Sequence, residues 1–172
     1  MDKYEGFREF VSARQQALMR TAYLLTGDAH RAEDLLQTVL TRIARHWPKL
    51  ARDGNPEAYA RRSLVNEHVS WLRRRRTDIL TSSPPERAYD PESAGLHRMV
   101  LQQALVRLTP RQRAVLVLRF YEDLSVEETA EALNCSPGTV KSQTHYALGR
   151  LRVLAPELAD LLSEIDPVEV PR

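Results

Sequence analysis

The sequence contains few of the residues that characterise secreted, membrane-spanning and β-rich proteins. Its single cysteine, Cys135, excludes an internal disulfide framework and a cysteine-rich metal site. No apolar run approaches the roughly twenty residues that span a bilayer, and residues 1–16 lack the apolar core of a signal peptide. The six glycines and the 6% aromatic content disfavour a long β-sandwich. We therefore expect a cytoplasmic protein made of helices.

Signatures of catalysis are also missing. The five histidines are dispersed, and neither the cysteine nor any serine lies in a nucleophile motif. The chain has no glycine-rich phosphate-binding loop. Its carboxylates are plentiful, but they fall on helical surfaces, where solvation is their usual state. The sequence predicts neither an enzyme nor a cofactor or metal site.

The charge distribution is more informative than the net charge. A net charge of +2 over 172 residues is too small to indicate nucleic-acid binding. Residues 57–76, however, contain six arginines against two glutamates, whereas residues 121–131 and 156–170 are acidic. A basic face with acidic flanks suits a protein that contacts DNA on one surface and another protein elsewhere.

Hydrophobic periodicity predicts three helices in the first half of the chain. Gly27 suits a helix end, and Asp28 can cap the helix that follows. Pro48 is expected to end this second helix. Asn55 and Pro56 then combine a cap with a proline at the first helical position. The three helices are predicted at residues 4–25, 28–47 and 56–76.

A flexible linker is expected between two domains. Residues 77–95 contain three prolines and no sustained period, and a compact domain rarely holds a structureless loop of this length. The predicted fold class is all-α: two small helical domains joined by a flexible linker, the second a four-helix domain with a helix-turn-helix. The predicted boundaries are 1–76 for the first domain, 77–95 for the linker, 96–155 for the second domain and 156–172 for an acidic tail.

The four shorter helices of the second half have clear start signals. Thr109 with Gln112, and Ser125 with Glu128, have the spacing of capping boxes. The last helix begins within "NCSPGTVKSQTHYALGRLR", where Ser136 can cap and the proline after it suits the first helical position. Two short helices separated by such a turn form a helix-turn-helix pattern.

The last helix has two distinct faces when each residue advances by about 100°. The predicted buried stripe consists of Val140, Thr144, Ala147, Leu148 and Leu151. The opposite face holds groups that suit base edges and phosphates. This face and its borders comprise Thr139, Lys141, Ser142, Gln143, His145, Tyr146 and Gly149. The same pattern also fits a plain amphipathic helix with a solvated face.

The third helix combines apolar and basic residues. The side chains that can pack inward are Ala58, Leu64, Val65, Val69 and Leu72. Other faces carry Arg61, Arg62, Asn66 and Ser70, and the positive surface continues through Trp71, Arg73, Arg74, Arg75 and Arg76. Aromatic side chains among basic ones suit unstacked bases and the nucleic-acid backbone. The alternative is a solvated, arginine-rich helix end that the helix dipole favours.

Three segments, in order, resemble the extracytoplasmic-function (group IV) sigma factors of bacterial RNA polymerase. The family's segment that docks on the polymerase clamp helices is similar to "RAEDLLQTVLTRIARHW". The helix that opens and reads the minus-ten promoter element is similar to "AYARRSLVNEHVSWLRRRR". The domain that reads the minus-thirty-five element is similar to "LTPRQRAVLVLRFYEDLSVEETAEALNCSPGTVKSQTHYALGRLR". The resemblance implies an alternative sigma factor that binds core polymerase and directs promoter-specific initiation of transcription.

The resemblance also implies roles for individual residues. Those expected to bind polymerase are Asp34, Leu35, Gln37, Thr38, Thr41 and Arg42. Those expected at the minus-ten element are Asp53, Gly54, Asn55, Arg61, Arg62, Asn66, Trp71, Arg73 and Arg74. The first three of these would help form a pocket for a flipped base, which repays part of the unstacking cost. Those expected at the minus-thirty-five element are Arg119, Thr139, Lys141, Ser142, Gln143, His145 and Tyr146.

The resemblance implies three partners: core RNA polymerase, bound through its clamp helices and its flap; promoter DNA; and an anti-sigma factor.

The sequence departs from the family pattern on the last helix. Gln143 stands where many members of the family have arginine, and His145 with Tyr146 replaces a commoner aromatic–basic pair. Because arginine reads guanine whereas glutamine more often reads adenine, a promoter sequence cannot be carried over from better-known relatives.

Two other functions fit parts of the sequence. A stand-alone helix-turn-helix regulator would share the second domain, but it leaves "AEDLLQ" and the arginine-rich third helix without a role. A protein-interaction module, such as an anti-sigma antagonist or a scaffold, would bind polymerase or a sigma factor without opening a promoter.

Overall fold

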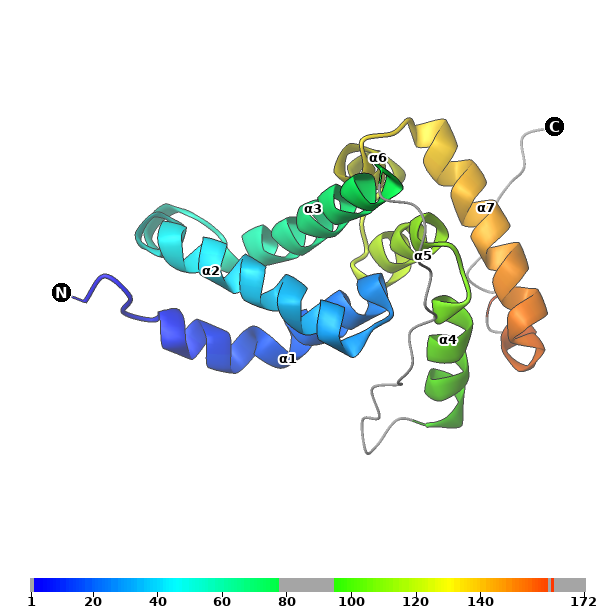
Figure 1. Ribbon diagram of the computed structural model, residues 1–172, viewed down its shortest axis with the longest axis horizontal. Coiled ribbons are helices and arrows are strands. Elements are labelled where there is room, and N and C mark those ends of the chain that lie inside the picture. Colours follow the sequence, from blue (N-terminus) through cyan, green and yellow to red (C-terminus); the bar gives the residue numbers. More distant parts are fainter. Residues whose placement is uncertain (1, 78–94, 161, 163–172) are drawn as a thin grey trace. The chain divides into compact units, whose positions relative to one another are not determined.

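The computed structural model describes residues 2–77, 95–160 and 162, and these residues form helices and turns without a strand, which confirms the all-α prediction. The chain divides into two compact units, Met1–Arg87 and Ala88–Arg172. Unit 1 contains α1 (Phe7–Thr26), α2 (Ala29–Asp53) and α3 (Pro56–Thr77). Unit 2 contains α4 (Leu96–Val106), α5 (Pro110–Leu116), the π-helical η1 (Val117–Tyr121), α6 (Val126–Leu133), α7 (Pro137–Leu154) and the 3₁₀ turn η2 (Pro156–Leu158) (Figure 1). Most of the predicted linker, residues 78–94, and most of the predicted tail lie outside the described residues.

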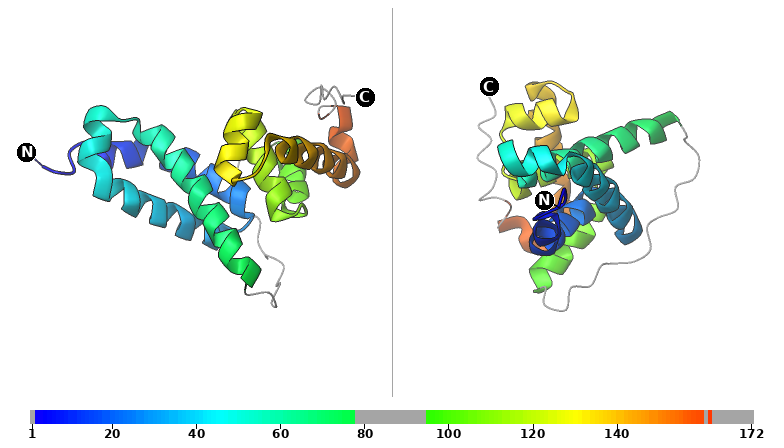
Figure 2. Two further views of the ribbon diagram at one scale, coloured as in Figure 1. Left: turned by 90° about the horizontal axis from the view of Figure 1, so that it is seen from above. Right: turned by 90° about the vertical axis from the view of Figure 1, so that its left-hand side faces the viewer.

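In unit 1, all three helices pack against one another (Figures 1 and 2). Three of the predicted helix signals, at Gly27, Asp28 and Asn55, are confirmed. Gly27 ends α1 in the left-handed conformation, with φ of 69°, which glycine adopts without steric cost. Asp28 caps α2 by accepting a hydrogen bond from the Arg31 N–H at 2.9 Å. The Asn55 side chain likewise accepts from the Ala58 N–H at 3.1 Å, at the start of α3.

The prediction that Pro48 ends the second helix was wrong, because α2 continues through it to Asp53. A proline inside a helix removes one backbone hydrogen bond and crowds the preceding turn. Here tertiary packing compensates for that loss. Trp47, beside the proline, is 5% exposed. Its ring centroid lies 5.3 Å from that of Phe7 and 5.4 Å from that of Phe10. Its Nε1 donates a hydrogen bond to the Glu5 carbonyl at 2.7 Å. These contacts hold the last turns of α2 against α1.

The core face of α3 differs in part from the predicted one. Leu64, Val65 and Val69 are buried as expected. Ala58, however, is exposed, and Leu72 is only half-buried. The interior positions that sequence reasoning missed are Ala60, Ser63 and His68. Because α3 packs on both α1 and α2, its buried surface is wider than the single apolar stripe that periodicity detects.

Unit 2 begins its helices where the capping residues predict. Thr109 with Gln112 and Ser125 with Glu128 both form complete capping boxes, each with the side chain and backbone bonds of the motif. The π-helical turn η1 continues directly from α5 and packs against α6. The long helix α7 packs against α4, α5, α6 and η2. These contacts leave one face of α7 outside the core.

Candidate nucleic-acid interface

The first turn of α7 is fixed by Ser136. Its Oγ accepts a hydrogen bond from the Thr139 N–H at 3.1 Å and lies 2.9 Å from the Thr139 hydroxyl. The proline that follows it occupies the first turn, where no backbone donor is needed. Because the Val140 N–H donates to the Ser136 carbonyl at 3.1 Å, the donor of this turn that is left for a phosphate is the Gly138 N–H.

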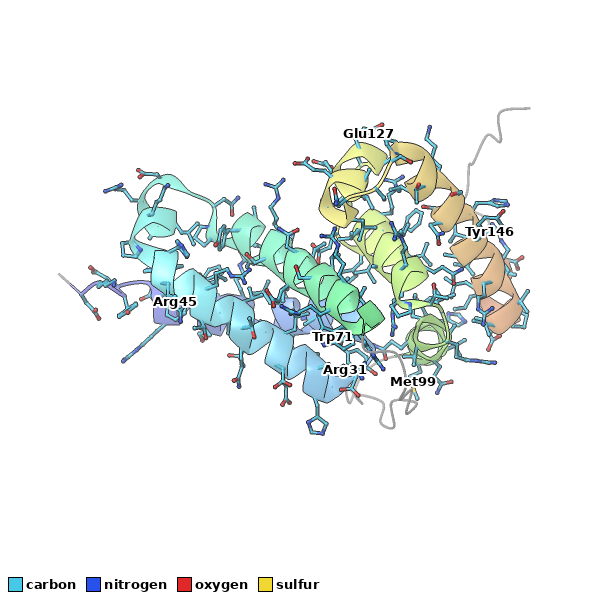
Figure 3. All side chains as sticks on the ribbon, turned by 45° about the horizontal axis from the view of Figure 1, so that its top comes forward. Arg31, Arg45, Trp71, Met99, Glu127 and Tyr146 are labelled. Atoms are coloured by element: carbon cyan, nitrogen blue, oxygen red, sulfur yellow. The ribbon has the colours of Figure 1, made fainter. Side chains whose placement is uncertain are left out.

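The two predicted faces of α7 are confirmed. All five residues of the predicted stripe are buried, and Val140 and Ala147 have no exposed surface. On the opposite side Tyr146 is 64% exposed (Figure 3), and its ring lies edge-on to that of His145 at 5.8 Å. Lys141 and Ser142 are exposed on the same helix, and Gln143 is half-buried. The arrangement presents an aromatic pair, an amide and a cation along one helix.

Two of the predicted DNA contacts are engaged within the protein. The Ser142 hydroxyl donates to the Thr139 carbonyl at 3.1 Å, which leaves its lone pairs outward as acceptors. Arg119 lies in η1, where its Nη1 donates to the Leu124 carbonyl, and its guanidinium lies 5.7 Å from the Phe120 ring centroid. Arg119 therefore has a structural role, because its bond to the Leu124 carbonyl holds the turn that leads into α6.

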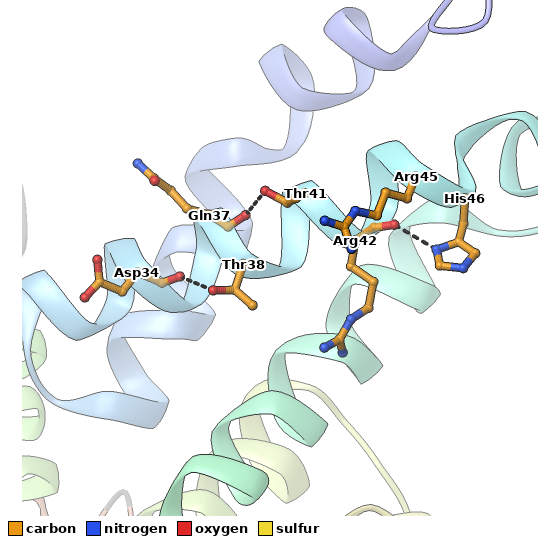
Figure 4. A pocket seen from close by; sticks show the side chains of 7 residues that line it. All are labelled: Asp34, Gln37, Thr38, Thr41, Arg42, Arg45 and His46. Atoms are coloured by element: carbon orange, nitrogen blue, oxygen red, sulfur yellow. Dashed lines mark hydrogen bonds between the residues drawn. The ribbon is translucent and has the colours of Figure 1, made fainter.

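The predicted polymerase-binding residues line a hollow on one face of α2. This hollow, of about 620 Å³, is lined by Asp34, Gln37, Thr38, Thr41, Arg42, Arg45 and His46 (Figure 4). The Thr38 and Thr41 hydroxyls donate to the carbonyls of Asp34 and Gln37, four residues back, at 2.9 and 2.8 Å. These bonds fix the rotamers of the two threonines. Leu35 is the exception among the predicted residues, because it is 7% exposed and packs into the core.

A second hollow, of about 220 Å³, lies between the start of α2 and the end of α3. Its lining comprises Thr26, Arg31, Asp34, Leu35, Thr38, Glu67, His68, Trp71 and Arg74. Arg31 lies beside Trp71 (Figure 3), with its guanidinium 4.8 Å from the centroid of the Trp71 ring. The Arg75 guanidinium lies 5.1 Å from the same centroid. Asp34 and Thr38 line both hollows, so the predicted polymerase and promoter surfaces of unit 1 are contiguous. Sequence reasoning missed Arg31 and Glu67, because neither lies in a local pattern with its partners.

The residues predicted at the minus-ten element do not gather at one point. Asp53, Gly54 and Asn55 are exposed at the turn between α2 and α3. Glycine allows a close approach at Gly54, where a Cβ would lie in tight contact with the Leu50 carbonyl oxygen, at 3.1 Å. Trp71 follows Asn55 by sixteen residues, or about 24 Å along the helix axis. Of the predicted residues between these ends, Arg61, Arg62 and Asn66 are exposed, and Arg73 and Arg74 are exposed beyond Trp71. The set runs from the turn before α3 along the length of the helix, but not on one face, because Arg62 and Trp71 are turned by about 180° from each other at about 100° per residue.

The described residues contain no cluster of three or more histidine, cysteine, aspartate or glutamate side chains arranged to hold a metal ion. None of the described helices has an apolar stretch of the length needed to cross a membrane.

Comparison with known proteins assigns each unit to a family. The family described as Sigma-70 region 2 matches residues 10–77, and the one described as Sigma-70, region 4 matches residues 104–153. The chain is 44% identical over 149 residues to the RNA polymerase sigma-E factor of Streptomyces avermitilis, a match that covers 85% of this chain and 83% of that protein. It is 34% identical over 158 residues to the ECF RNA polymerase sigma factor SigL of Mycobacterium tuberculosis, which covers 88% and 89%.

A solved structure is similar to most of the chain. This is the sigma factor RpoE from Bartonella quintana, crystallised in complex with the anti-sigma factor NepR. The match has a TM-score of 0.67 and 25% sequence identity, and it covers 87% of this chain and 96% of that one.

Proposed function

The chain belongs to the ECF sigma factors of RNA polymerase, and from this membership we propose how its surfaces divide the work of an alternative sigma factor. Unit 1 binds core polymerase through the exposed residues of α2 and contacts the minus-ten element along α3. Unit 2 reads the minus-thirty-five element with α7. The observation that supports this division most directly is α7 itself, with its buried stripe and its exposed Lys141, His145 and Tyr146.

The chemistry of each surface agrees with its proposed partner. Lysine, amide and aromatic side chains on a capped helix suit a major groove and its phosphates. The exposed arginines and Asn66 along α3 suit a strand that has left the duplex. The hydroxyl and amide groups of Gln37, Thr38 and Thr41 suit a polar protein interface that forms and dissociates. A stand-alone regulator would leave these α2 side chains without a partner.

The proposal places the protein in the cytoplasm, where its polymerase is, and gives it no catalytic role. We further propose that an anti-sigma factor controls it, because the similar RpoE structure is a complex with one. Such a partner would act by covering the α2 face or the exposed face of α7. Purification of the chain from its host should then yield a protein that competes with core polymerase or with promoter DNA.

Run-off transcription tests the proposed function. Core polymerase is incubated with a panel of host promoters, with and without the chain, and transcripts that depend on the chain are identified. Asn66→Ala and Lys141→Ala should each reduce these transcripts, since they remove contacts to the two promoter elements. Arg107→Ala is the matched control, because it removes one exposed positive charge of unit 2 outside α7. Duplex binding without polymerase, and no transcript from any template, would contradict the proposal.

A further inference from the structure

The two acidic residues of α3 each pair with two arginines. At the start of the helix, Glu57 lies 3.2 Å from Arg14 of α1 and 2.9 Å from Arg61. Further along, Glu67 lies 2.8 Å from Arg42 of α2 and 3.3 Å from Arg74. The two carboxylates therefore have the same chemistry, but the helices that they join are different.

The partners of Glu67 belong to the two surfaces proposed above. Arg42 lines the hollow on α2 that is proposed to bind polymerase, and in Figure 4 its side chain extends from that face toward α3. Arg74 lines the second hollow with Trp71 and is one of the α3 residues proposed to contact promoter DNA. A single carboxylate thus contacts one cation from each surface.

The burial of Glu67 strengthens this arrangement. The Glu67 side chain is 19% exposed, against 40% for Arg42 and 67% for Arg74. Charges near a partly buried carboxylate interact through less water than charges on an open surface, so salt screens them less. Because Arg74 is the more exposed of the two side chains, its guanidinium can extend to a phosphate while the Glu67 carboxylate stays between the helices.

We propose that Glu67 is a positioning residue through which Arg42, on the polymerase-binding helix, sets the strength of the Arg74 contact with promoter DNA. The inference rests on the proposed function. Arg42 and Arg74 share one negative charge, and the Arg42 bond is the shorter. When Arg42 is removed, Glu67 interacts with Arg74 alone, and that guanidinium attracts a DNA phosphate less strongly. When Glu67 is neutralised, Arg74 attracts the phosphate more strongly, and Arg42 no longer influences it.

The test measures binding of a promoter fragment by the complete holoenzyme, with core polymerase present at a saturating concentration. The fragment is one whose transcription depends on the chain in the run-off assay. Glu67→Gln should tighten DNA binding roughly two- to fivefold, the range expected for one exposed ion pair. It should also steepen the dependence of log K on log salt by about one phosphate contact. Arg42→Ala should weaken binding by a similar factor.

The decisive comparison is the double variant. The holoenzyme with Arg42→Ala combined with Glu67→Gln should bind DNA as tightly as that with Glu67→Gln alone, because the negative charge shared by Arg42 and Arg74 is already absent. In the Glu57→Gln background, by contrast, Arg42→Ala should keep its full effect. Glu57 is the matched control, since its two arginine partners lie outside α2. Arg42→Gln repeats the test with more of the arginine stem retained.

Two results would overturn the inference. One is an Arg42→Ala effect of equal size with and without Glu67, which would mean that Arg42 acts independently. The other is unchanged affinity and salt slope in Arg74→Ala, which would remove Arg74 from the DNA. In either case continued sigma-dependent transcription would leave the proposed function standing. Failure of the unsubstituted chain to support transcription would instead refute the proposed function.

Discussion

Ser136 offers a way to separate the stability of α7 from its contact with DNA. Ser136→Ala removes the Oγ that accepts from the Thr139 N–H at 3.1 Å. Loss of a serine cap at an exposed helix start costs about 1 kcal/mol, which is about a fivefold change in an equilibrium constant. The amides of the first turn of α7 should therefore exchange with solvent about fivefold faster than in the unsubstituted chain.

The assay must report unit 2 alone. Both tryptophans, Trp47 and Trp71, lie in unit 1, so tryptophan fluorescence would follow the wrong unit. Hydrogen exchange of individual amides, followed by NMR, reports α7 directly. Unchanged exchange at Thr139 and Val140 in Ser136→Ala would refute the assignment of Ser136 as the cap.

Ser136→Asp provides the complementary variant. Aspartate caps as well as serine, and its charge favours the positive end of the helix, so exchange in α7 should stay slow. The same charge repels a phosphate at the helix N-terminus, so affinity for the minus-thirty-five element should fall. Gln103→Glu adds an equal charge at an exposed position of α4 and controls for net charge. Wild-type DNA affinity in Ser136→Asp would show that no phosphate lies at this end of α7.

Three further substitutions test the core and the exposed face. Leu148→Ala leaves a cavity at a side chain that is 2% exposed. It should lower the free energy of unfolding of unit 2 by about 2–5 kcal/mol, measured by hydrogen exchange of the slowest amides of this unit. Tyr146→Ala, at 64% exposure, should change that stability by less than about 0.5 kcal/mol but weaken binding to the minus-thirty-five element in a gel-shift titration of the holoenzyme. Trp47→Phe loses the 2.7 Å bond to the Glu5 carbonyl and part of the buried ring packing with Phe7 and Phe10, and urea unfolding of unit 1 should show a loss of at least about 1 kcal/mol.

The helix starts could be predicted from the sequence because capping is local. Asp28, Ser125 and Ser136 each bond to a backbone N–H three residues ahead, and such a spacing is visible without knowledge of the fold. The faces of α7 were predictable for a related reason. Its buried stripe follows one helical period, and packing uses one side of the helix.

The end of α2 could not be predicted in this way. Proline disfavours a helix interior, and the features that outweigh it, the Phe7 and Phe10 rings and the Glu5 carbonyl around Trp47, are about forty residues away in sequence. The same limit applies to the candidate site. Arg31 meets Trp71, and Arg42 meets Glu67, only because α2 and α3 pack together, so neither pair has a signature in its own segment.

The packing of α2 on α3 also affects how substitutions in unit 1 should be interpreted. Asp34 and Thr38 line both hollows, and Glu67 pairs with an arginine from each proposed surface. Neutralising Glu67 changes the electrostatic surroundings of both surfaces, because its arginine partners at 2.8 and 3.3 Å lie within the Debye length of about 8 Å at physiological salt. A substitution at Asp34 or Thr38 alters the lining of both hollows. A loss of transcription in such a variant therefore does not by itself identify the partner that was lost. Separate titrations with core polymerase, and of promoter DNA with saturated holoenzyme, are needed to assign these residues to either partner.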